Sequence, residues 1–287
     1  MTPPPGLVAA GRRHSVGLRR DGTVLATGNG HAGELDVTDW VRIVAVAAGN
    51  VHAFGNTGRS HTVGLLADGT VRASGWNGDG QCEVGAWTGV VGIAAGWRRT
   101  LGVRSDGTVL SSGRPDEGAC DVSAWREIVA ASCGDWHSVG LRADGTAVAV
   151  GVDRRGQCRV TGWTDLTAVA AGYLHTAGVT ADGRVLAVGD PASGALDVTR
   201  WRDVVGVAAG SHHTVGLTAS GRVLATGSNR EGQCDVGGWR DIVAVAAGSR
   251  HTVGLRRDGT AVAAGSNADR QCEVATWSAL RVPRTAR

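Results

Sequence analysis

The sequence has no lysine, because all 29 of its basic residues are arginine. A lysine Schiff base, a phosphate-loop lysine and a lysine general base are therefore excluded. Aromatic residues other than tryptophan are nearly absent: the 287 residues include 10 Trp but one Tyr and one Phe. The net charge of +3 is too small to indicate a charge-driven nucleic-acid binder, so we expect no nucleic-acid partner.

Long hydrophobic segments are missing as well. No apolar run reaches the ~18 residues of a membrane span. Residues 1–5, Met-Thr-Pro-Pro-Pro, have neither the basic nor the apolar region of a secretory signal. We therefore expect a cytoplasmic protein without a membrane partner. The cysteines lack the C-x-x-C spacing of a zinc site, and we expect neither a metal nor a cofactor.

The sequence does contain an internal repeat, which tryptophan marks. Successive markers are 38 residues apart, except for a first gap of 47 that holds a 9-residue insertion within residues 50–60. The seven marker tryptophans are Trp40, Trp87, Trp125, Trp163, Trp201, Trp239 and Trp277. A column of six histidines, replaced in the third unit by Arg99, has the same spacing. The units fill nearly the whole chain, so we expect residues 1–287 to form one domain.

Each unit reads as a set of short strands. The last complete unit, WRDIVAVAAGSRHTVGLRRDGTAVAAGSNADRQCEVAT, predicts strands at 242–247, 251–256, 261–264 and 272–274, with a hairpin turn at Asp258-Gly259. Seven units of four strands, without a helix signal, predict an all-β fold: a seven-bladed β-propeller with four-stranded blades. An open solenoid is the alternative, but it would leave two bare sheet edges.

Each end of the sequence holds part of a unit. Residues 7–11 begin in mid-unit and lack the tryptophan opening, whereas residues 277–280 carry that opening. The two fragments together make one unit. We therefore predict that the N- and C-terminal segments pair and close the ring.

The pattern VAAGxxHTVGLxxDGTVxAxGxNxxGQC resembles the regulator of chromosome condensation repeat family over residues 7–282. The resemblance implies the propeller fold but no single function. Its eukaryotic chromatin member acts as a nucleotide exchange factor on a small GTPase, whereas the shorter units here look more like those of bacterial relatives. The bacterial propeller-type β-lactamase inhibitor protein is similar and presents aromatic residues to its target. The plant UV-B photoreceptor is more distantly similar, and its Gly-Trp-Arg-His-Thr motif has one near match at residues 96–100.

Residues present in every unit are interpreted as scaffold. The marker tryptophans are expected to pack the blades, and the column histidines to donate hydrogen bonds to the backbone. Cysteine exchanges with Leu35 and Leu196 at one position of the unit, which indicates a buried apolar site. Residues one blade apart are also too distant for a disulfide. The cysteines at this position are Cys82, Cys120, Cys158, Cys234 and Cys272.

Candidate functional residues lie where the units differ. Most non-marker rings fall in the turn between the first strand and the histidine column. Trp76 lies in the loop after the third strand, which strand alternation places on the same face. Five rings in units two to five, grouped with arginine, are typical of a binding hot spot. The candidate binding residues are His52, Phe54, Trp76, Trp97, Arg98, Arg99, Asp135, Trp136, Tyr173 and His212. The alternative is that each ring packs on a neighbouring loop.

Two functions remain open. In the first, a monomeric propeller binds a protein or peptide partner through this face, and its rigidity limits the entropy lost on binding. In the second, it is an enzyme for a small organic ligand, a cyclase, lyase or isomerase with its pocket in the axial funnel. The candidate catalytic residues are then Arg99, Asp135, Tyr173 and His212, with Arg99 holding an anion. Light sensing, nucleotide exchange and sugar binding have fewer residues in their favour.

Overall fold

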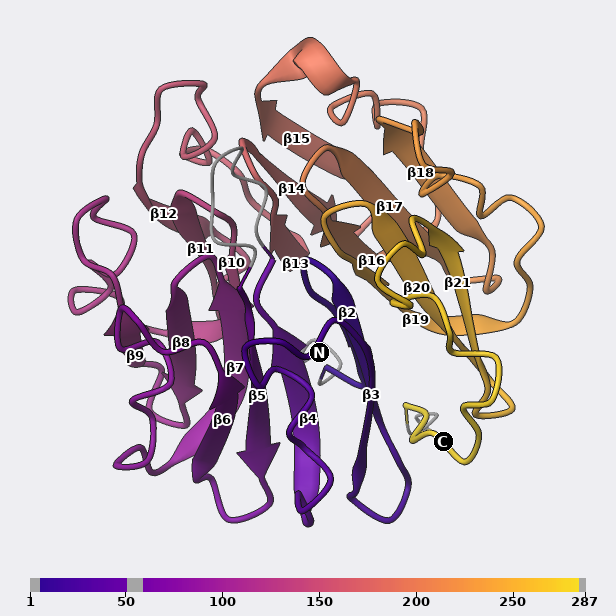
Figure 1. Cartoon of the computed structure of the whole chain (residues 1–287). Helices are drawn as coiled ribbons and strands as arrows, with labels where there is room; N and C mark the ends of the chain where they lie inside the picture. The colour runs from indigo at the N-terminus through magenta and orange to yellow at the C-terminus, as the bar shows by residue number, and fades with distance from the viewer. Residues whose placement is uncertain (1–5, 51–58, 284–287) are drawn as a thin grey trace.

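The computed structural model describes residues 6–50 and 59–283 of the chain. Their strands form seven three-stranded antiparallel sheets, which are the blades of a ring (Figure 1). Within each blade the strands pair in chain order, so each blade is built from two successive hairpins. We number the blades 1 to 7 along the chain.

The three strands of a blade recur with nearly constant length. The first strands are β1 (Val8–Ala10), β4 (Ile43–Ala48), β7 (Val90–Gly96), β10 (Ile128–Cys133), β13 (Leu166–Ala171), β16 (Val204–Ala209) and β19 (Ile242–Ala247). The second strands are β2 (His14–Leu18), β5 (His61–Leu66), β8 (Arg99–Arg104), β11 (His137–Arg142), β14 (His175–Thr180), β17 (His213–Thr218) and β20 (His251–Arg256). The third strands are β3 (Val24–Gly28), β6 (Val71–Gly75), β9 (Val109–Gly113), β12 (Ala147–Gly151), β15 (Val185–Gly189), β18 (Val223–Gly227) and β21 (Ala261–Gly265).

The first strand of each blade lies nearest the axis of the ring. β7 contacts β10, and β13 contacts β16, so first strands of adjacent blades touch one another. Their last residues are mostly alanine, because small side chains allow seven strands to approach one axis. Among the described residues the single helix is a 3-10 turn, η1 (Pro191–Ser193). The described residues therefore contain no helix that is long and apolar enough to cross a membrane.

The predicted fourth strand is wrong, because residues 272–274 and their equivalents form turns. The Val274 N–H donates to the Cys272 carbonyl at 2.8 Å, and the Trp277 N–H donates to the Val274 carbonyl at 2.9 Å. The Cys272 N–H donates to Oδ1 of Asn267 at 2.9 Å. These backbone groups are satisfied within their own segment, so they are not available to pair with the third strand.

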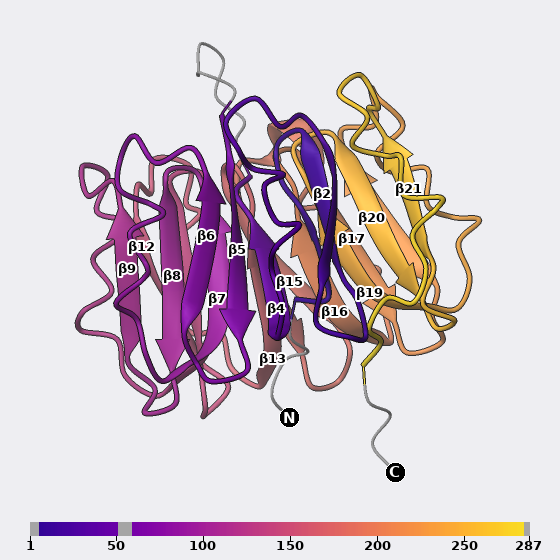
Figure 2. The same ribbon diagram turned by 60° about the horizontal axis from the view of Figure 1, so that its bottom comes forward.

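Residues from both ends of the chain complete blade 1. Arg19 and Leu280 form an antiparallel bridge, and the Arg281 N–H donates to the Leu18 carbonyl at 2.8 Å. The indole of Trp277 packs on Gly17 in β2. Figure 2 shows the sheet of blade 1, in indigo, beside the yellow sheet of blade 7. The predicted closure of the ring by its two ends is confirmed.

The marker tryptophans pack the blades, as predicted. Trp125 is 5% exposed, and its ring lies over Gly140 in β11, where a Cβ atom would be 2.8 Å from the ring carbon Cζ3. The same contact between a marker indole and a second-strand glycine recurs in all seven blades. Glycine is required there because the indole occupies the space of a side chain.

Each column histidine bonds to a hydroxyl group of the next blade, a partner that was not expected from the sequence. His137 Nε2 lies 2.7 Å from Oγ1 of Thr176, and this hydroxyl donates to the Gln157 carbonyl at 2.7 Å. Since the hydroxyl hydrogen is used there, the imidazole Nε2–H is the donor to the hydroxyl oxygen. His251 makes the corresponding contact with Ser15 at 2.9 Å and links blade 7 to blade 1.

Burial keeps these imidazoles neutral. It lowers the pKa of His14, His137 and His213 to about 3. The same cause lowers the pKa of the other three, His61, His175 and His251, to about 4. A neutral, fully buried imidazole that bonds to a neighbouring blade is part of the scaffold.

Candidate functional site

Two kinds of loop meet on one face of the propeller, as predicted. The Trp76 N–H, just after the third strand of blade 2, donates to the carbonyl of Ser60, just before the second strand, at 2.8 Å. Asn29 and Arg13 make the same bond in blade 1 at 2.9 Å. The turn after each first strand and the loop after each third strand therefore lie side by side, and we call this side the candidate face.

Five residues of blades 2 to 4 form a continuous stack on the candidate face, which we call the Trp–Arg cluster: Trp76, Trp97, Arg98, Arg114 and Trp136. The Arg98 guanidinium carbon lies 4.9 Å from the ring centroid of Trp76 and 4.5 Å from that of Trp97. The Arg114 guanidinium carbon lies 5.6 Å from the ring centroid of Trp97. The Trp136 ring meets the Trp97 ring edge-on, with the two centroids 4.5 Å apart. Cation–π contacts of this kind stabilise a cation between two indoles.

The backbone at Arg98 is unusual. Its φ of +58° lies in the left-handed region that a residue with a side chain seldom adopts, and no equivalent turn residue described in the other blades shares it. Arg98 Nε lies 3.4 Å from Oδ2 of Asp79, an ion pair without hydrogen-bond geometry. Trp97 is 6% exposed, whereas Trp76 and Trp136 are half-buried and reach the surface. Strain of this kind is concentrated at functional sites.

Arg99 does not reach the surface. It is 1% exposed, and its guanidinium donates to the carbonyls of Gly134 and His137, both at 2.6 Å, and of Asp135 at 3.0 Å. Its Nε donates to Ser138 Oγ at 3.1 Å, which is the bond that a column histidine makes elsewhere. Arg99 therefore replaces a histidine in the scaffold, and we do not retain it as an anion clamp.

The other described residues of the predicted arc are not part of the Trp–Arg cluster. Tyr173 and His212 meet edge-on with their ring centroids 5.3 Å apart, and Asp135 is fully buried. His52 and Phe54 lie outside the described residues.

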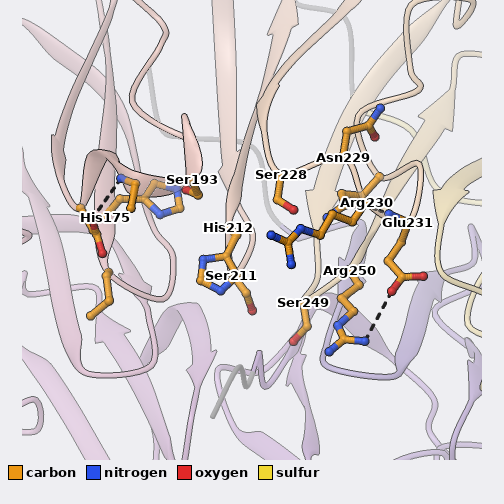
Figure 3. Close-up of a pocket in the computed structure, with 14 residues that line it drawn as sticks. His175, Ser193, Ser211, His212, Ser228, Asn229, Arg230, Glu231, Ser249 and Arg250 are labelled. Carbon is orange, nitrogen blue, oxygen red and sulfur yellow. Dashed lines mark hydrogen bonds and ion pairs between the residues drawn. The ribbon is translucent and has the colours of Figure 1, made fainter. Parts of the chain in front are cut away.

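A cavity of about 700 Å³ opens on the candidate face between blades 5, 6 and 7 (Figure 3). His212 is the one candidate residue that lines it. Burial lowers the pKa of His212, Asp190 opposes this shift, and Arg230 and Arg250 add to it. The imidazole is therefore mostly neutral near pH 7 and sits among charged neighbours.

The cysteines are free thiols. Burial raises the pKa of Cys120 to about 11, and its Sγ lies 3.1 Å from the Arg114 carbonyl. The other four cysteines at this position of the unit have the same raised pKa, so none is a reactive thiolate. They are half-buried, whereas Cys133 is buried. The described part of the chain contains no group of three or more His, Cys, Asp or Glu arranged to hold a metal ion.

Comparison with protein families identifies the repeat. A profile of the regulator of chromosome condensation (RCC1) repeat matches seven segments, at residues 7–34, 56–81, 90–119, 128–157, 166–195, 204–233 and 242–271. The chain belongs to this family. In its seven regulator of chromosome condensation repeats, the histidine column and the second-strand glycine carry the contacts between and within blades.

Solved structures share the fold at low identity. The ectodomain of the receptor kinase CR4 from Physcomitrella patens matches 91% of this chain and 74% of its own, with 19% identity and a TM-score of 0.71. Prp20p from Saccharomyces cerevisiae, described with its binding to Gsp1p and histones, matches 96% and 87%, with 17% identity and a TM-score of 0.68. Human WBSCR16 matches 86% and 85%, with 18% identity and a TM-score of 0.69. No curated protein sequence matches this chain.

Two residues of this region were not found from the sequence: Arg114, which belongs to the cluster, and Asp79, which pairs with Arg98. Arg114 is absent from the candidate binding residues, yet it lies over Trp97 and pairs with Asp116 at 3.1 Å and Glu117 at 2.9 Å. Asp79 was not singled out. Both lie in the loop after a third strand, as Trp76 does, so aligning that loop across the RCC1 repeats was the signal that could have found them.

Proposed function

We propose that this chain is a protein-recognition propeller that contacts its partner through the Trp–Arg cluster of blades 2 to 4. The observation that carries the proposal is the arginine stacked between two indoles on a left-handed backbone. Tryptophan and arginine are the residues enriched in interface hot spots. A cluster whose side chains are already held in place loses little entropy on binding.

The partner's contact area would be the half-buried part of the cluster. Trp76 and Trp136 are half-buried, and Arg98 and Arg114 retain 19% and 30% of side-chain exposure. Acidic neighbours hold both guanidinium groups in position. This surface suits a protein or peptide that offers apolar side chains and carboxylates.

Structural relatives agree with this proposal at the level of the fold. Prp20p is described by its binding to Gsp1p and histones, and in another structure it is bound to Kap60. Both descriptions concern a propeller that binds other proteins. The identity of 17–18% supports a shared scaffold, and it does not transfer those partners to this chain.

The enzyme alternative has less support. Of its four candidate catalytic residues, Arg99 and Asp135 are buried, and only His212 lines the cavity. Tyr173 contacts the His212 ring edge-on, with the ring centroids 5.3 Å apart. Recognition requires none of these groups.

The test is affinity capture from a host lysate with the full chain, followed by a binding measurement with the purified protein that is retained. We expect Trp76→Ala combined with Trp136→Ala to abolish capture, since each hot-spot residue is worth about 2 kcal/mol, or roughly thirtyfold in Kd. Val91→Ala combined with Val205→Ala is the matched control. Both valines are exposed near the start of β7 and β16, whereas the turns of the candidate face follow the end of these strands. Equal Kd values for the cluster variant and the control would refute the proposal.

A further inference from the structure

The cavity between blades 5, 6 and 7 contains a buried hydroxyl that has no bonding partner in the described part of the chain. Ser211 lines this cavity and is 1% exposed, and its Oγ makes no hydrogen bond. The equivalent serine of blade 7, Ser249, bonds to Oδ1 of Asn50 at 2.8 Å. Buried hydroxyl groups are normally satisfied, so Ser211 points to a polar ligand atom as its partner.

Two arginines and two acidic residues line this cavity, and both carboxylates are paired with an arginine. Arg250 pairs with Glu231 at 3.5 Å, and Asp190 pairs with Arg155 at 3.7 Å. Arg230 has no ion pair or side-chain hydrogen bond to another described residue. Figure 3 shows its guanidinium extending across the cavity toward His212. The positive charge of Arg230 contributes to the lowered pKa of His212, after the larger effect of burial.

A smaller cavity of about 160 Å³ lies beside it toward blade 1, and three arginines and one aspartate line this second cavity. It shares Ser249 and Arg250 with the larger cavity. Arg12 lines it, and Nη1 of that side chain is buried without a hydrogen bond in the described part of the chain. Burial, followed by the charges of Arg13 and Arg250, lowers the pKa of Arg12. Asp269, the acidic residue in this lining, pairs with Arg13 at 3.4 Å.

Ser193 and Ser228 add two hydroxyl groups to the lining of the larger cavity. The Asn229 amide and the Gln233 side-chain carbonyl oxygen bond within their own loop. A volume of about 700 Å³ is that of a small-molecule site, and an unpaired guanidinium binds carboxylate or phosphate in two-pronged geometry. We infer that this cavity binds a small hydroxylated anion, a sugar phosphate or a sugar acid, with its anionic group on Arg230 and its hydroxyl groups on the serines.

This site goes beyond the proposed protein recognition. The Trp–Arg cluster belongs to blades 2 to 4, whereas the cavity is built by blades 5 to 7, and the two share no residue. A partner protein can therefore fail to bind while the anion binds, or the reverse. The two tests report on different residues.

The experiment is isothermal titration calorimetry of the full chain with glucose 6-phosphate, gluconate and glucose at constant ionic strength. We expect at least one of the two anions to bind with a Kd below about 1 mM and glucose to give no measurable binding. The two anions distinguish a phosphate from a carboxylate ligand. Arg230→Gln should weaken binding about tenfold or more, and Ser211→Ala should weaken it by a smaller factor.

Arg257→Gln is the matched control, because it removes the same charge from an exposed turn between β20 and β21 on the opposite face. It should leave the Kd unchanged. The inference is overturned if neither anion binds, if glucose binds as tightly, or if Arg230→Gln has no larger effect than Arg257→Gln. Thermal unfolding of each variant verifies that the fold is intact.

Discussion

An ion pair between equivalent positions of the repeat occurs at two blade boundaries, that of blades 2 and 3 and that of blades 6 and 7, in different surroundings. Arg98 and Asp79 are 3.4 Å apart at the first, and Arg250 and Glu231 are 3.5 Å apart at the second. The side chains of the first pair are 19% and 20% exposed, whereas those of the second are 62% and 41% exposed. The residues that flank each pair explain the difference.

The flanking residues occupy equivalent positions in the repeat. Trp76 and Trp97 stand where the other boundary has Ser228 and Ser249. Two indoles fill the space above the first ion pair, and two serines leave part of a cavity above the second. One backbone framework therefore supports either a closed stack or an open pocket, and side-chain size at two positions decides which is formed.

The largest predicted effect is the loss of stability at low pH, which tests whether the same column of histidines stabilises both boundaries. In the unfolded chain the column histidines titrate near pH 6.5. Burial lowers their folded pKa to about 3 for His14, His137 and His213, so below pH 6.5 the unfolded chain binds more protons. Stability should be fully present above about pH 6.5 and fall with decreasing pH, by about 1.4 kcal/mol per pH unit for each such histidine.

Urea unfolding at about pH 7 and about pH 5 measures this loss, and hydrogen exchange shows where it occurs. Both boundaries should lose protection together, because the histidine bonds connect the blades around the ring. Equal stability at the two pH values would contradict the role of the column. Loss of protection at one boundary alone would show that the two halves unfold independently.

The second prediction concerns the one column position without a histidine. Arg99→Ala should destabilise the chain by about 3 kcal/mol or more, because it removes a fully buried side chain together with its hydrogen bonds to three backbone carbonyls and to Ser138. Arg99→His should recover part of this loss by restoring a bond to Ser138. Chemical unfolding of both variants is the measurement, with exposed Arg257→Ala as the control. A stable Arg99→Ala variant would return Arg99 to the list of candidate ligand-binding residues.

The fold was predictable because identical residues make identical contacts in every unit. The spacing of 38 residues predicted the blades, and the incomplete units at the two ends predicted the closure that Leu280 and Trp277 provide. The fourth strand was not predictable from its short apolar segment. The backbone groups of this segment form hydrogen bonds within local turns and to side chains such as Asn267. Hydrogen bonds of this kind produce no recognisable hydrophobic pattern in the sequence.

The candidate site was predictable in part. Strand alternation predicted that Trp76 and Trp97 share a face, and they sandwich Arg98 there. The depth of each side chain was not predictable, since burial of Arg99 depends on carbonyls of the next blade. The cavity had no signal of its own, because it arises where residues such as Ser211 are small.

The third prediction concerns the stack of Trp76 on Arg98 at the boundary between blades 2 and 3. Trp76→Ser copies the residue of the other boundary, and it should cost about 1–2 kcal/mol through the lost stacking on Arg98 and the lost burial. A double-mutant cycle with Arg98→Ala should give a coupling of about 1 kcal/mol between the two side chains. The reverse change, Ser228→Trp, should leave stability within about 0.5 kcal/mol, because it lies at the edge of a cavity. A coupling near zero would show that the stack is only a surface arrangement.

The smallest predicted effect compares the two ion pairs directly. Glu231→Gln should change stability by less than about 0.5 kcal/mol, because water screens an exposed pair and Arg250 can be solvated once its partner is neutral. Asp79→Asn should cost about 1 kcal/mol more, since Arg98 is held between two indoles and has less access to water. Unfolding in about 1 M salt should abolish the small effect of Glu231→Gln and preserve most of that of Asp79→Asn. Equal losses would mean that the tryptophans do not change the environment of the pair, and the contrast between the two boundaries would then be one of shape alone.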